Sequence, residues 1–317
     1  MNIHFWGVRG SVPSPLTPGQ IKAKISTVLQ RATPEDVASD EARERFLASL
    51  PRWVYGTVGG NTACVEVVME KGPRLVFDAG SGIRVMGMLS APPEDKHYHL
   101  LFSHFHWDHI QGLPFFGQAY NPRAIFDVYS PFPDMEKYLS EQMVAPYFPV
   151  PFGAFTKNFT FHTVKPGEIF EIEGVKICCT EMFHPGKSYS YRVEEIDENG
   201  KKKSFVYATD VELGDKDFVK TPETAKVFEN ADVLILDSQY TVEELHNKPN
   251  WGHSAFCYAI DFAAVWNIKN LYLFHHEPTY DDRKIDLIYE SAQWYANYST
   301  NNEVTVHIAV EGQIVSI

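Results

Sequence analysis

The stretch His104-Phe105-His106-Trp107-Asp108-His109 places four side chains that can bind a metal ion within six residues. It follows the apolar run Leu100-Leu101-Phe102, which predicts a buried strand that ends just before it. In a tight loop after that strand, the spacing of two sends His104 and His106 to one side, and Asp108 and His109 can turn to another. Imidazole and carboxylate ligands suit zinc, manganese or iron, whereas soft copper sites favour thiolates. The stretch therefore predicts a metal site at a strand end.

A metal cage needs further ligands, and three polar residues elsewhere in the chain stand at similar positions. His184 lies in a Phe-His-Pro-Gly turn, Asp210 follows the apolar segment Phe205-Val206-Tyr207, and His275 follows another apolar segment. Each is an ordinary turn residue when taken alone. Together with the run at 104–109 they supply enough ligands for two ions.

Short segments rich in Val, Ile, Tyr and Phe recur along the chain and predict strands. These segments are residues 3–6, 63–70, 74–77, 99–103, 124–129, 175–182, 189–193, 204–209, 233–237, 271–274, 304–309 and 313–316. Helical spacing of apolar residues predicts helices at 254–266, with Ser254 as the cap residue, and at 282–298. Helices separate strands mainly in the C-terminal half, so we expect an α/β (α+β) fold of stacked sheets flanked by helices, as one domain over residues 1–317.

Residues 14–55 interrupt this pattern. Thr17-Pro18 and Thr33-Pro34 each resemble an N-cap followed by proline at the first helical position, and apolar residues follow at helical spacing. We therefore expect two inserted helices. Helices of ~12–15 residues are marginal in isolation, so their apolar faces should lie on the sheets or on another subunit. A homodimer contact, a wall over the active site and a peripheral decoration are all compatible with this segment.

The net charge of the 317-residue chain is −13, with a pI of about 5.4. Such a field repels polyanions, so long nucleic acid is a poor candidate for the main substrate. The dense basic run, residues 201–203, follows Asp197-Glu198-Asn199-Gly200 and predicts a charged hairpin turn. The N-terminus has no secretory signal pattern, no run approaches the ~20 apolar residues of a membrane span, and the four cysteines fit no disulfide framework. We expect a cytoplasmic protein without a membrane partner.

The order His-x-His-x-Asp-His, then His184, Asp210 and His275, resembles the metallo-β-lactamase superfamily. The resemblance covers nearly the whole chain and includes Gly59-Gly60-Asn61-Thr62 and Phe77-Asp78-Ala79-Gly80. It implies an αββα sandwich that holds metal ions at one edge of its sheets, with the helical insertion near the N-terminus.

The element Trp251-Gly252-His253-Ser254, followed by a helix and a strand that ends in His275, resembles the phosphodiesterase branch of that superfamily. The branch includes the tRNA-processing endonuclease RNase Z and small bacterial proteins similar to cyclic-nucleotide phosphodiesterases. The opening Phe5-Trp6-Gly7-Val8-Arg9-Gly10-Ser11 and the segment Phe274-His275-His276-Glu277-Pro278 are most similar to the second group.

The resemblance also implies a role for each site residue. One ion would be held by His104, His106 and His184, the second by Asp108, His109 and His275, and Asp210 would bridge the two. His276 is an alternative to His275, and Asp78 would orient the ligand loop through hydrogen bonds. Asp108 and His253 are the expected catalytic residues. His253 would face the substrate phosphate as an acid or charge stabiliser, and the alternative is a histidine in the capping region of the helix that comes after it.

The function implied is a hydrolase with two divalent ions, zinc first and manganese or iron as alternatives. Its substrate would be a small phosphodiester or cyclic nucleotide, attacked by a hydroxide that bridges the metals. The alternatives are a lactone, thioester or β-lactam hydrolase of the same fold, a diiron redox or oxygen-binding protein, RNase Z itself and a binding module without activity. His106 stands where the flavodiiron relatives have Glu, which favours hydrolysis. The chain has no glycine- and lysine-rich arm for tRNA, and every cage position is filled.

Overall fold

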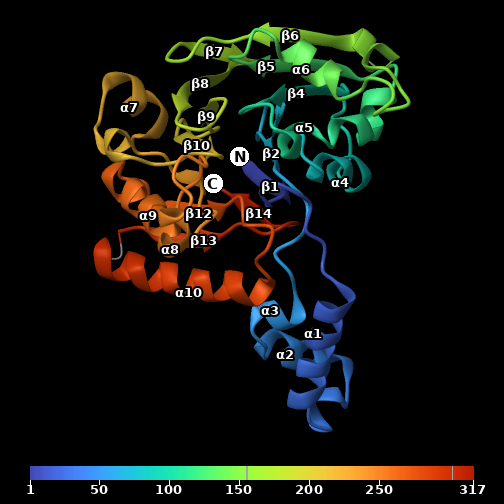
Figure 1. The fold of residues 1–317 in the computed structure, drawn as a ribbon, viewed down its shortest axis with the longest axis vertical. Coiled ribbons are helices and arrows are strands. Elements are labelled where there is room, and N and C mark those ends of the chain that lie inside the picture. Colours follow the sequence, from blue (N-terminus) through green and yellow to red (C-terminus); the bar gives the residue numbers. More distant parts are fainter. Residues whose placement is uncertain (155, 302) are drawn as a thin grey trace.

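Two β-sheets pack face to face and carry helices on their outer surfaces in the computed structural model, which describes residues 1–154, 156–301 and 303–317 (Figure 1). Over these residues the first sheet has the strand order β14-β1-β2-β3-β4-β5-β6, and the second has the order β13-β12-β11-β10-β9-β8-β7. This arrangement confirms the αββα sandwich expected from the sequence.

The strands of the first sheet are β1 (Asn2–Gly7), β2 (Cys64–Val68), β3 (Arg74–Phe77), β4 (His97–Leu101), β5 (Ile125–Ser130), β6 (Phe159–Thr163) and β14 (Ile314–Ser316). Those of the second are β7 (Ile169–Ile172), β8 (Val175–Met182), β9 (Ser188–Ile196), β10 (Lys202–Ala208), β11 (Val233–Asp237), β12 (Asn270–Phe274) and β13 (Thr305–Ile308). The α-helices are α1 (Pro18–Arg31), α2 (Asp40–Ser49), α3 (Arg52–Tyr55), α4 (Gly82–Leu89), α5 (Trp107–Ile110), α6 (Met135–Glu141), α7 (Pro222–Phe228), α8 (Val242–His246), α9 (Phe256–Val265) and α10 (Asp282–Ser299). Short 3₁₀ turns occur at Glu35–Val37, Leu113–Phe115, Gly117–Tyr120, Phe152–Ala154, Thr156–Asn158 and Asp215–Phe218.

Aromatic side chains from both sheets fill the space between them. Phe77 of β3 contacts Phe205 and Tyr207 of β10, with ring centroids 5.6 and 5.3 Å apart, and Phe5 of β1 contacts Phe274 of β12 at 6.3 Å. All five rings are almost completely buried. Burial of each such side chain contributes roughly 1.5–3 kcal/mol, so this shared core holds the two sheets in fixed register at the edge that carries the site.

The direction of the central strands decides where polar residues gather. Strands β3 to β6 run parallel in the first sheet, and β10 to β13 run parallel in the second. Asp78 follows the end of β3, and the loop that begins at Ser103 follows β4. Asp210, Asp237 and His275 stand at the carboxyl ends of β10, β11 and β12. Since the carboxyl ends of parallel strands meet at one edge of a sheet, five chain segments deliver their polar residues to the same place.

The predicted strands all overlap observed ones, but β6 and β7 were not predicted. The cap assigned to Ser254 was wrong. Helix α9 begins at Phe256 with Ala255 as its N-cap, and the Ser254 hydroxyl instead donates to the carbonyl of Val211 and accepts from the amide of Leu213, which fixes the loop after Asp210. Among the described helices, none combines the length and the apolar character that crossing a bilayer requires.

Helices α1, α2 and α3 form an arm that extends away from the two sheets (Figure 1). The N-cap predicted at Thr17 is present and forms a capping box with Gln20, but the second predicted helix start was wrong. Thr33 bonds through its amide and hydroxyl to Asp36 and closes a 3₁₀ turn, so α2 begins only at Asp40, with Ser39 as its N-cap.

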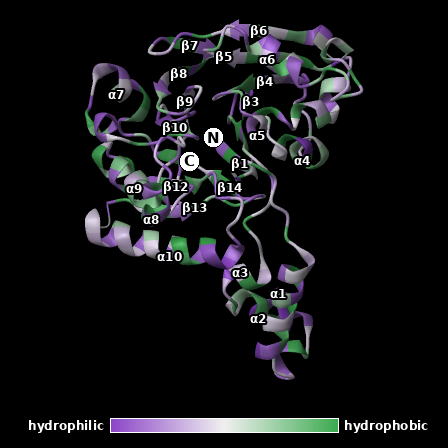
Figure 2. Ribbon diagram, viewed as in Figure 1, coloured by the Kyte–Doolittle hydropathy of each residue, from purple (hydrophilic) through white to green (hydrophobic). Residues whose placement is uncertain are grey.

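Helix α1 has no buried residue. Figure 2 shows hydrophobic and hydrophilic residues side by side along the arm, and Ile21, Ile25 and Leu29 on one side of α1 are 45%, 55% and 70% exposed. The expectation that the sheets cover this face was therefore wrong, and a homodimer contact stays a prediction.

Lys24 anchors the arm to the body. Its ammonium forms an ion pair with Asp282 of α10 at 2.8 Å and donates to the carbonyls of Trp53 and Gly56. The other oxygen of the Asp282 carboxylate accepts from the Thr57 hydroxyl and the Val58 amide, both at 3.0 Å. One buried carboxylate therefore joins α1, the segment after α3 and α10.

We expect Lys24→Ala to loosen the arm, because it leaves the buried Asp282 carboxylate without its cation. Loss of one partner of such a pair costs about 1–3 kcal/mol, which lowers the midpoint of thermal unfolding and speeds proteolytic cleavage within residues 18–55. The matched control is Lys22→Ala, which removes an exposed lysine of the same helix. Equal cleavage rates for the two variants would show that the ion pair does not hold the arm.

Candidate metal centre

Three residues that follow strand ends at the site have a left-handed backbone. Asp78, Asp210 and His275 follow the ends of β3, β10 and β12, and their φ angles are 58°, 52° and 62°. Non-glycine residues rarely adopt this conformation, and each such position costs of order 1–3 kcal/mol that the surrounding structure must offset. The turn at each position bends the chain sharply, so that its side chain faces the gap between the strand ends.

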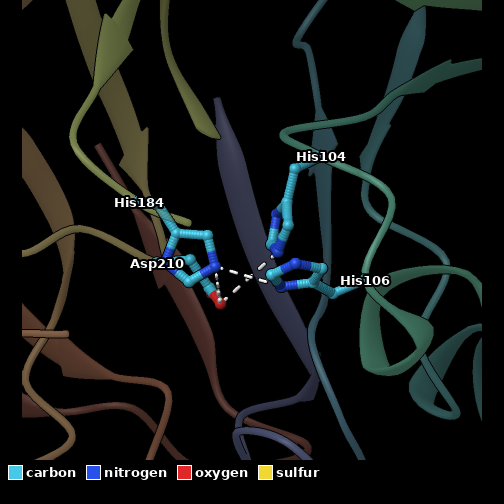
Figure 3. A group of neighbouring side chains, drawn as sticks. All are labelled: His104, His106, His184 and Asp210. Atoms are coloured by element: carbon cyan, nitrogen blue, oxygen red, sulfur yellow. Dashed lines mark hydrogen bonds and ion pairs between the residues drawn. The ribbon is translucent and has the colours of Figure 1, made fainter. Parts of the chain in front are cut away.

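The first group of side chains consists of His104, His106, His184 and Asp210, which point toward one another from separate segments (Figure 3). Nε2 of His104 lies 3.5 Å from Oδ2 of Asp210, and Nε2 of His184 lies 3.8 Å from the same oxygen. His106 presents Nδ1, 3.0 Å from Nε2 of His184. The potential ligand atoms of this group all lie within 4.8 Å of one another.

The second group consists of Asp108, His109, His275 and again Asp210. Here Oδ1 of Asp210 lies 3.1 Å from Nε2 of His109 and 3.1 Å from Nε2 of His275. Oδ2 of Asp108 lies 3.3 and 3.2 Å from the same two nitrogens. The two oxygens of Asp210 thus face different sets of histidines. The seven residues of the two groups, all of which the sequence analysis identified, together form the cage.

The hydrogen bonds behind the cage fix the histidine tautomers. Nδ1 of His109 donates to Asp78 at 2.8 Å, Nδ1 of His184 to the carbonyl of Gly252 at 2.8 Å, and Nδ1 of His275 to the side-chain oxygen of Gln239 at 3.0 Å. When such a ring is neutral, Nδ1 holds its one proton, so Nε2 presents a lone pair to the cage. That is the form in which histidine binds a metal.

Asp78 organises the start of the ligand loop. It accepts from the amide and hydroxyl of Ser103 at 2.8 and 2.7 Å and from the Tyr207 hydroxyl at 2.9 Å. The Ser103 hydroxyl gives its one proton to Asp78, so the 3.0 Å contact with Nδ1 of His104 has the histidine as donor. His104 then also presents its Nε2 lone pair to the cage.

The donor set fits a metal ion. Nε2 of His104 and Nε2 of His109 are buried and find no hydrogen-bond partner among the described residues, which is a costly state for a polar atom. Burial strongly lowers the pKa of His104, and the charge of His109 adds to this, so His104 is neutral at pH 7. A divalent ion bound by these nitrogens and carboxylates would satisfy both orphaned atoms.

The buried carboxylates of the cage need positive charge close to them. Burial opposes ionisation of Asp210, but the charges of His275, His109 and His104 outweigh it and hold the pKa of Asp210 well below its usual range. Burial likewise disfavours a charged His109, yet the charges of Asp210, Asp108 and Asp78 raise its pKa well above its usual value. The cage is therefore stable only when cationic charge balances its carboxylates.

A cavity of about 490 Å³ opens above the cage, and His253 forms part of its wall. Nδ1 of His253 contacts Oδ2 of Asp237 at 2.7 Å, which leaves Nε2 as the ring nitrogen available to a bound molecule. Burial lowers the pKa of His253, but the charge of Asp237 and its hydrogen bond outweigh this and, with smaller contributions from Asp210 and Asp108, raise that pKa to about 9. The alternative for His253, a place in the capping region of the following helix, finds no support, since the N-cap of α9 is Ala255.

Sequence reasoning left some positions open and missed others. The structure directs His276 away from the cage, because its Nε2 lies 2.9 Å from the carbonyl of Ala309, while His275 faces Asp108 and Asp210. Asp237 and Gln239 were missed as partners of His253 and His275. The sequence did carry a signal for Asp237, because it is the last residue of a buried strand, and Asp210 and His275 come just after the ends of two other strands. No local feature of the sequence marks Gln239.

A family model described as a beta-lactamase superfamily domain matches residues 73–276, which include all seven cage residues. The chain belongs to this superfamily. The protein named Ribonuclease Z from Acaryochloris marina is 25% identical to this chain over 247 residues, which cover 65% of this chain and 76% of the Acaryochloris protein. The resemblance to the RNase Z branch that the sequence indicated is thereby confirmed.

Solved structures share the architecture of this superfamily member. The metallo-β-lactamase fold protein YhfI from Bacillus subtilis is 16% identical, with a TM-score of 0.62 over 99% of this chain and 98% of that one. The short form of human tRNase Z is 18% identical, with a TM-score of 0.61 over 100% of this chain and 99% of that one. At such identities the comparison establishes the fold, and the fold together with the cage residues implies binding of divalent metal.

We expect Gly10→Ala to weaken metal binding. A Cβ at position 10 would lie 2.5 Å from Nδ1 and Cε1 of His275, whose ring is buried and held by Gln239. The displaced ring should lower the affinity for a divalent ion about 10–100-fold, the usual effect of disturbing the support of a ligand. Competition with a chromophoric chelator measures this affinity. Gly117→Ala is the control, because a Cβ there meets nothing within 4 Å among the described residues. Equal affinities in the two variants would contradict the packing argument.

Proposed function

We propose that this protein is a hydrolase with two divalent metal ions that cleaves a small phosphodiester or a cyclic nucleotide. The observation that carries the proposal is the position of Asp210, whose two carboxylate oxygens face two separate sets of histidines beside the His253–Asp237 pair. A single carboxylate placed in this way suits a bridge between two ions. The three other cage residues on each side supply the remaining ligands.

One ion would be held by His104, His106 and His184, and the other by Asp108, His109 and His275. This set contains five imidazoles, which favours zinc, with manganese or iron as alternatives, over magnesium or calcium. When bound, such ions supply a nucleophile near neutral pH and stabilise negative charge on a phosphoryl oxygen. The buried cage and its fixed tautomers hold the ligands ready, so that little reorganisation is needed.

His253 would act on the substrate from the wall of the cavity. Asp237 holds the ring by Nδ1 and favours its charged form, so Nε2 can donate a proton to a leaving oxygen or stabilise charge on the phosphate. Asp108, which also lines the cavity, would act as a ligand of the second ion. The amide of Ser11 donates to its Oδ2 at 2.8 Å, which fixes the carboxylate toward His109 and His275.

The volume of the cavity and the net charge of the chain support a small substrate. The cavity of about 490 Å³ lies between the cage and the side chains of Phe105 and Trp107, and Trp107 is 80% exposed. These rings offer apolar surface to a nucleobase or another flat group. The relatives named Ribonuclease Z support the phosphodiester class. The net charge of −13 opposes a long RNA, and Lys202 and Lys203 of the basic run form ion pairs with Glu194 and Glu70.

The sequence allowed the insertion at residues 14–55 to form a wall over the active site, and its position gives this alternative no support. None of the described residues that line the cavity belongs to residues 14–55, and the nearest of them in sequence is Ser11. Access of substrate is therefore set by the residues around the cage itself.

The purified protein, loaded with Zn²⁺ or Mn²⁺, should hydrolyse bis(p-nitrophenyl) phosphate or a cyclic nucleotide, lose this activity in chelator and regain it with metal. Asp210→Ala should abolish activity and release metal from both groups, because it removes the shared ligand. Asp215→Ala, which removes an exposed carboxylate nearby in sequence, is the matched control. Elemental analysis and release of p-nitrophenol are the measurements. If the loaded protein cleaves a lactone or thioester but no phosphodiester, the proposed reaction class is wrong.

His253→Ala should lower kcat about 10²–10⁴-fold, the usual contribution of a positioned proton donor, while the metal content stays near that of the wild type. Asp237→Asn should reduce kcat less, because the histidine remains but loses the charge that favours its protonated form. His246→Ala, at an exposed position on α8, is the control. Steady-state kinetics with elemental analysis separates the outcomes. Loss of metal in His253→Ala would make this residue a ligand, and an unchanged kcat would exclude a catalytic role.

A further inference from the structure

A second group of histidines and carboxylates lies between the two sheets, away from the cage. His97 and His99 stand on one face of β4, and the register pairs His99 with Asp127 of β5. His162 is on the neighbouring strand β6, and Glu173 approaches from the turn that joins β7 to β8 in the second sheet. These five residues form the His97 cluster.

Their contacts form one connected network. Nε2 of His97 lies 2.6 Å from Oδ2 of Asp127, and Nε2 of His162 lies 2.7 Å from the other oxygen of that carboxylate. Oε1 of Glu173 lies 3.3 Å from Nε2 of His99 and 3.7 Å from Nδ1 of His97. The rings of His97 and His99 are 4.2 Å apart, and potential ligand atoms of His97, His99 and Asp127 lie within 4.8 Å of one another.

His99 has an unsatisfied nitrogen. Its side chain is only 3% exposed, and its buried Nδ1 has no hydrogen-bond partner in the part of the chain that the structure describes. A buried acceptor of this kind costs about 1–3 kcal/mol, so its presence calls for a ligand. Burial lowers the pKa of His99, and the charge of His97 lowers it further against the opposing charges of Glu173 and Asp127. The ring is therefore neutral at pH 7, which is the form that binds metal.

The cluster is independent of the cage. His97 begins β4, whereas His104 follows the other end of that strand. A strand rises about 3.3 Å per residue, so the chain between them spans roughly 20 Å. Of the five residues in the cluster, none belongs to the two groups of the cage. The open side of the cluster gives an ion access, since His97 is 24% and Glu173 45% exposed.

We propose that His97, His99 and Asp127 form a second binding site for a divalent transition-metal ion, in which Glu173 of the opposite sheet holds Nε2 of His99 and leaves its Nδ1 for the ion. Two imidazoles and carboxylate oxygens select zinc or a similar ion over magnesium or calcium. His162 binds the outer oxygen of Asp127 and holds that carboxylate toward the ion, as the supporting partners of metal ligands commonly do. An ion in this position joins β4 to β5, and the hydrogen bond between Glu173 and His99 links the site to the β7–β8 turn of the other sheet.

The test is the number of zinc ions bound per chain. Wild type, His97→Gln and Asp127→Asn are equilibrated with Zn²⁺ at a low free concentration set by a chelator buffer, and bound zinc is measured by elemental analysis. His246→Gln is the matched control, since it removes an exposed histidine outside both groups. We expect each cluster variant to bind one zinc ion fewer than His246→Gln while keeping the basal hydrolase activity. An equal zinc content in all four proteins would overturn the proposal.

A second measurement separates this site from the cage. Asp210→Ala disrupts the cage, so any zinc-dependent rise in the thermal midpoint that remains in this variant should come from the His97 cluster. Adding His97→Gln to Asp210→Ala should abolish that rise, whereas adding His246→Gln should not. If Asp210→Ala binds no zinc at all, the His97 cluster is a hydrogen-bonded network without a metal, whatever the outcome of the activity assays.

Discussion

The buried carboxylate of Asp78 is the interaction on which the site depends. It follows β3 in the first sheet, and its two oxygens accept from Ser103 at the end of β4, from His109 in the ligand loop and from Tyr207 in the second sheet. One residue thus fixes the start of the loop, the tautomer of a ligand and the approach of the two sheets. The left-handed backbone of Asp78 is tolerated because all these partners hold it in place.

Charge balance explains the rest of the cage. The protein buries Asp78, Asp108 and Asp210 in a small space, and buried carboxylates are stable only beside cations or hydrogen-bond donors. Four of the five cage histidines, all but His106, use Nδ1 on groups behind the cage and direct Nε2 to its centre. This arrangement makes a poor hydrogen-bond network and a good metal site. His253 is held in the same way, because its Nδ1 is paired with the Asp237 carboxylate as that of His109 is paired with Asp78.

Strand β4 connects the two clusters of histidines. Its carboxyl end leads into the loop of the cage, and its first residues, His97 and His99, belong to the cluster between the sheets. Both clusters join the first sheet to the second, through Asp210 in one case and Glu173 in the other. The interface between the sheets is therefore apolar in its middle, where Phe77 and Tyr207 meet, and polar at the two places where β4 begins and ends.

The sequence by itself determined the class of fold and most of the cage. Segments rich in Val, Ile, Tyr and Phe mark the strands, and the density of ligands at 104–109 is a local signal that needs no tertiary information. Only the tertiary structure chose His275 over His276, paired Asp237 with His253, and moved the cap of α9 from Ser254 to Ala255. It alone assembled the His97 cluster, whose members are far apart along the chain. The physical reason is that periodicity and spacing are properties of neighbouring residues, whereas strand order, register and the packing of one sheet on another decide which distant side chains meet.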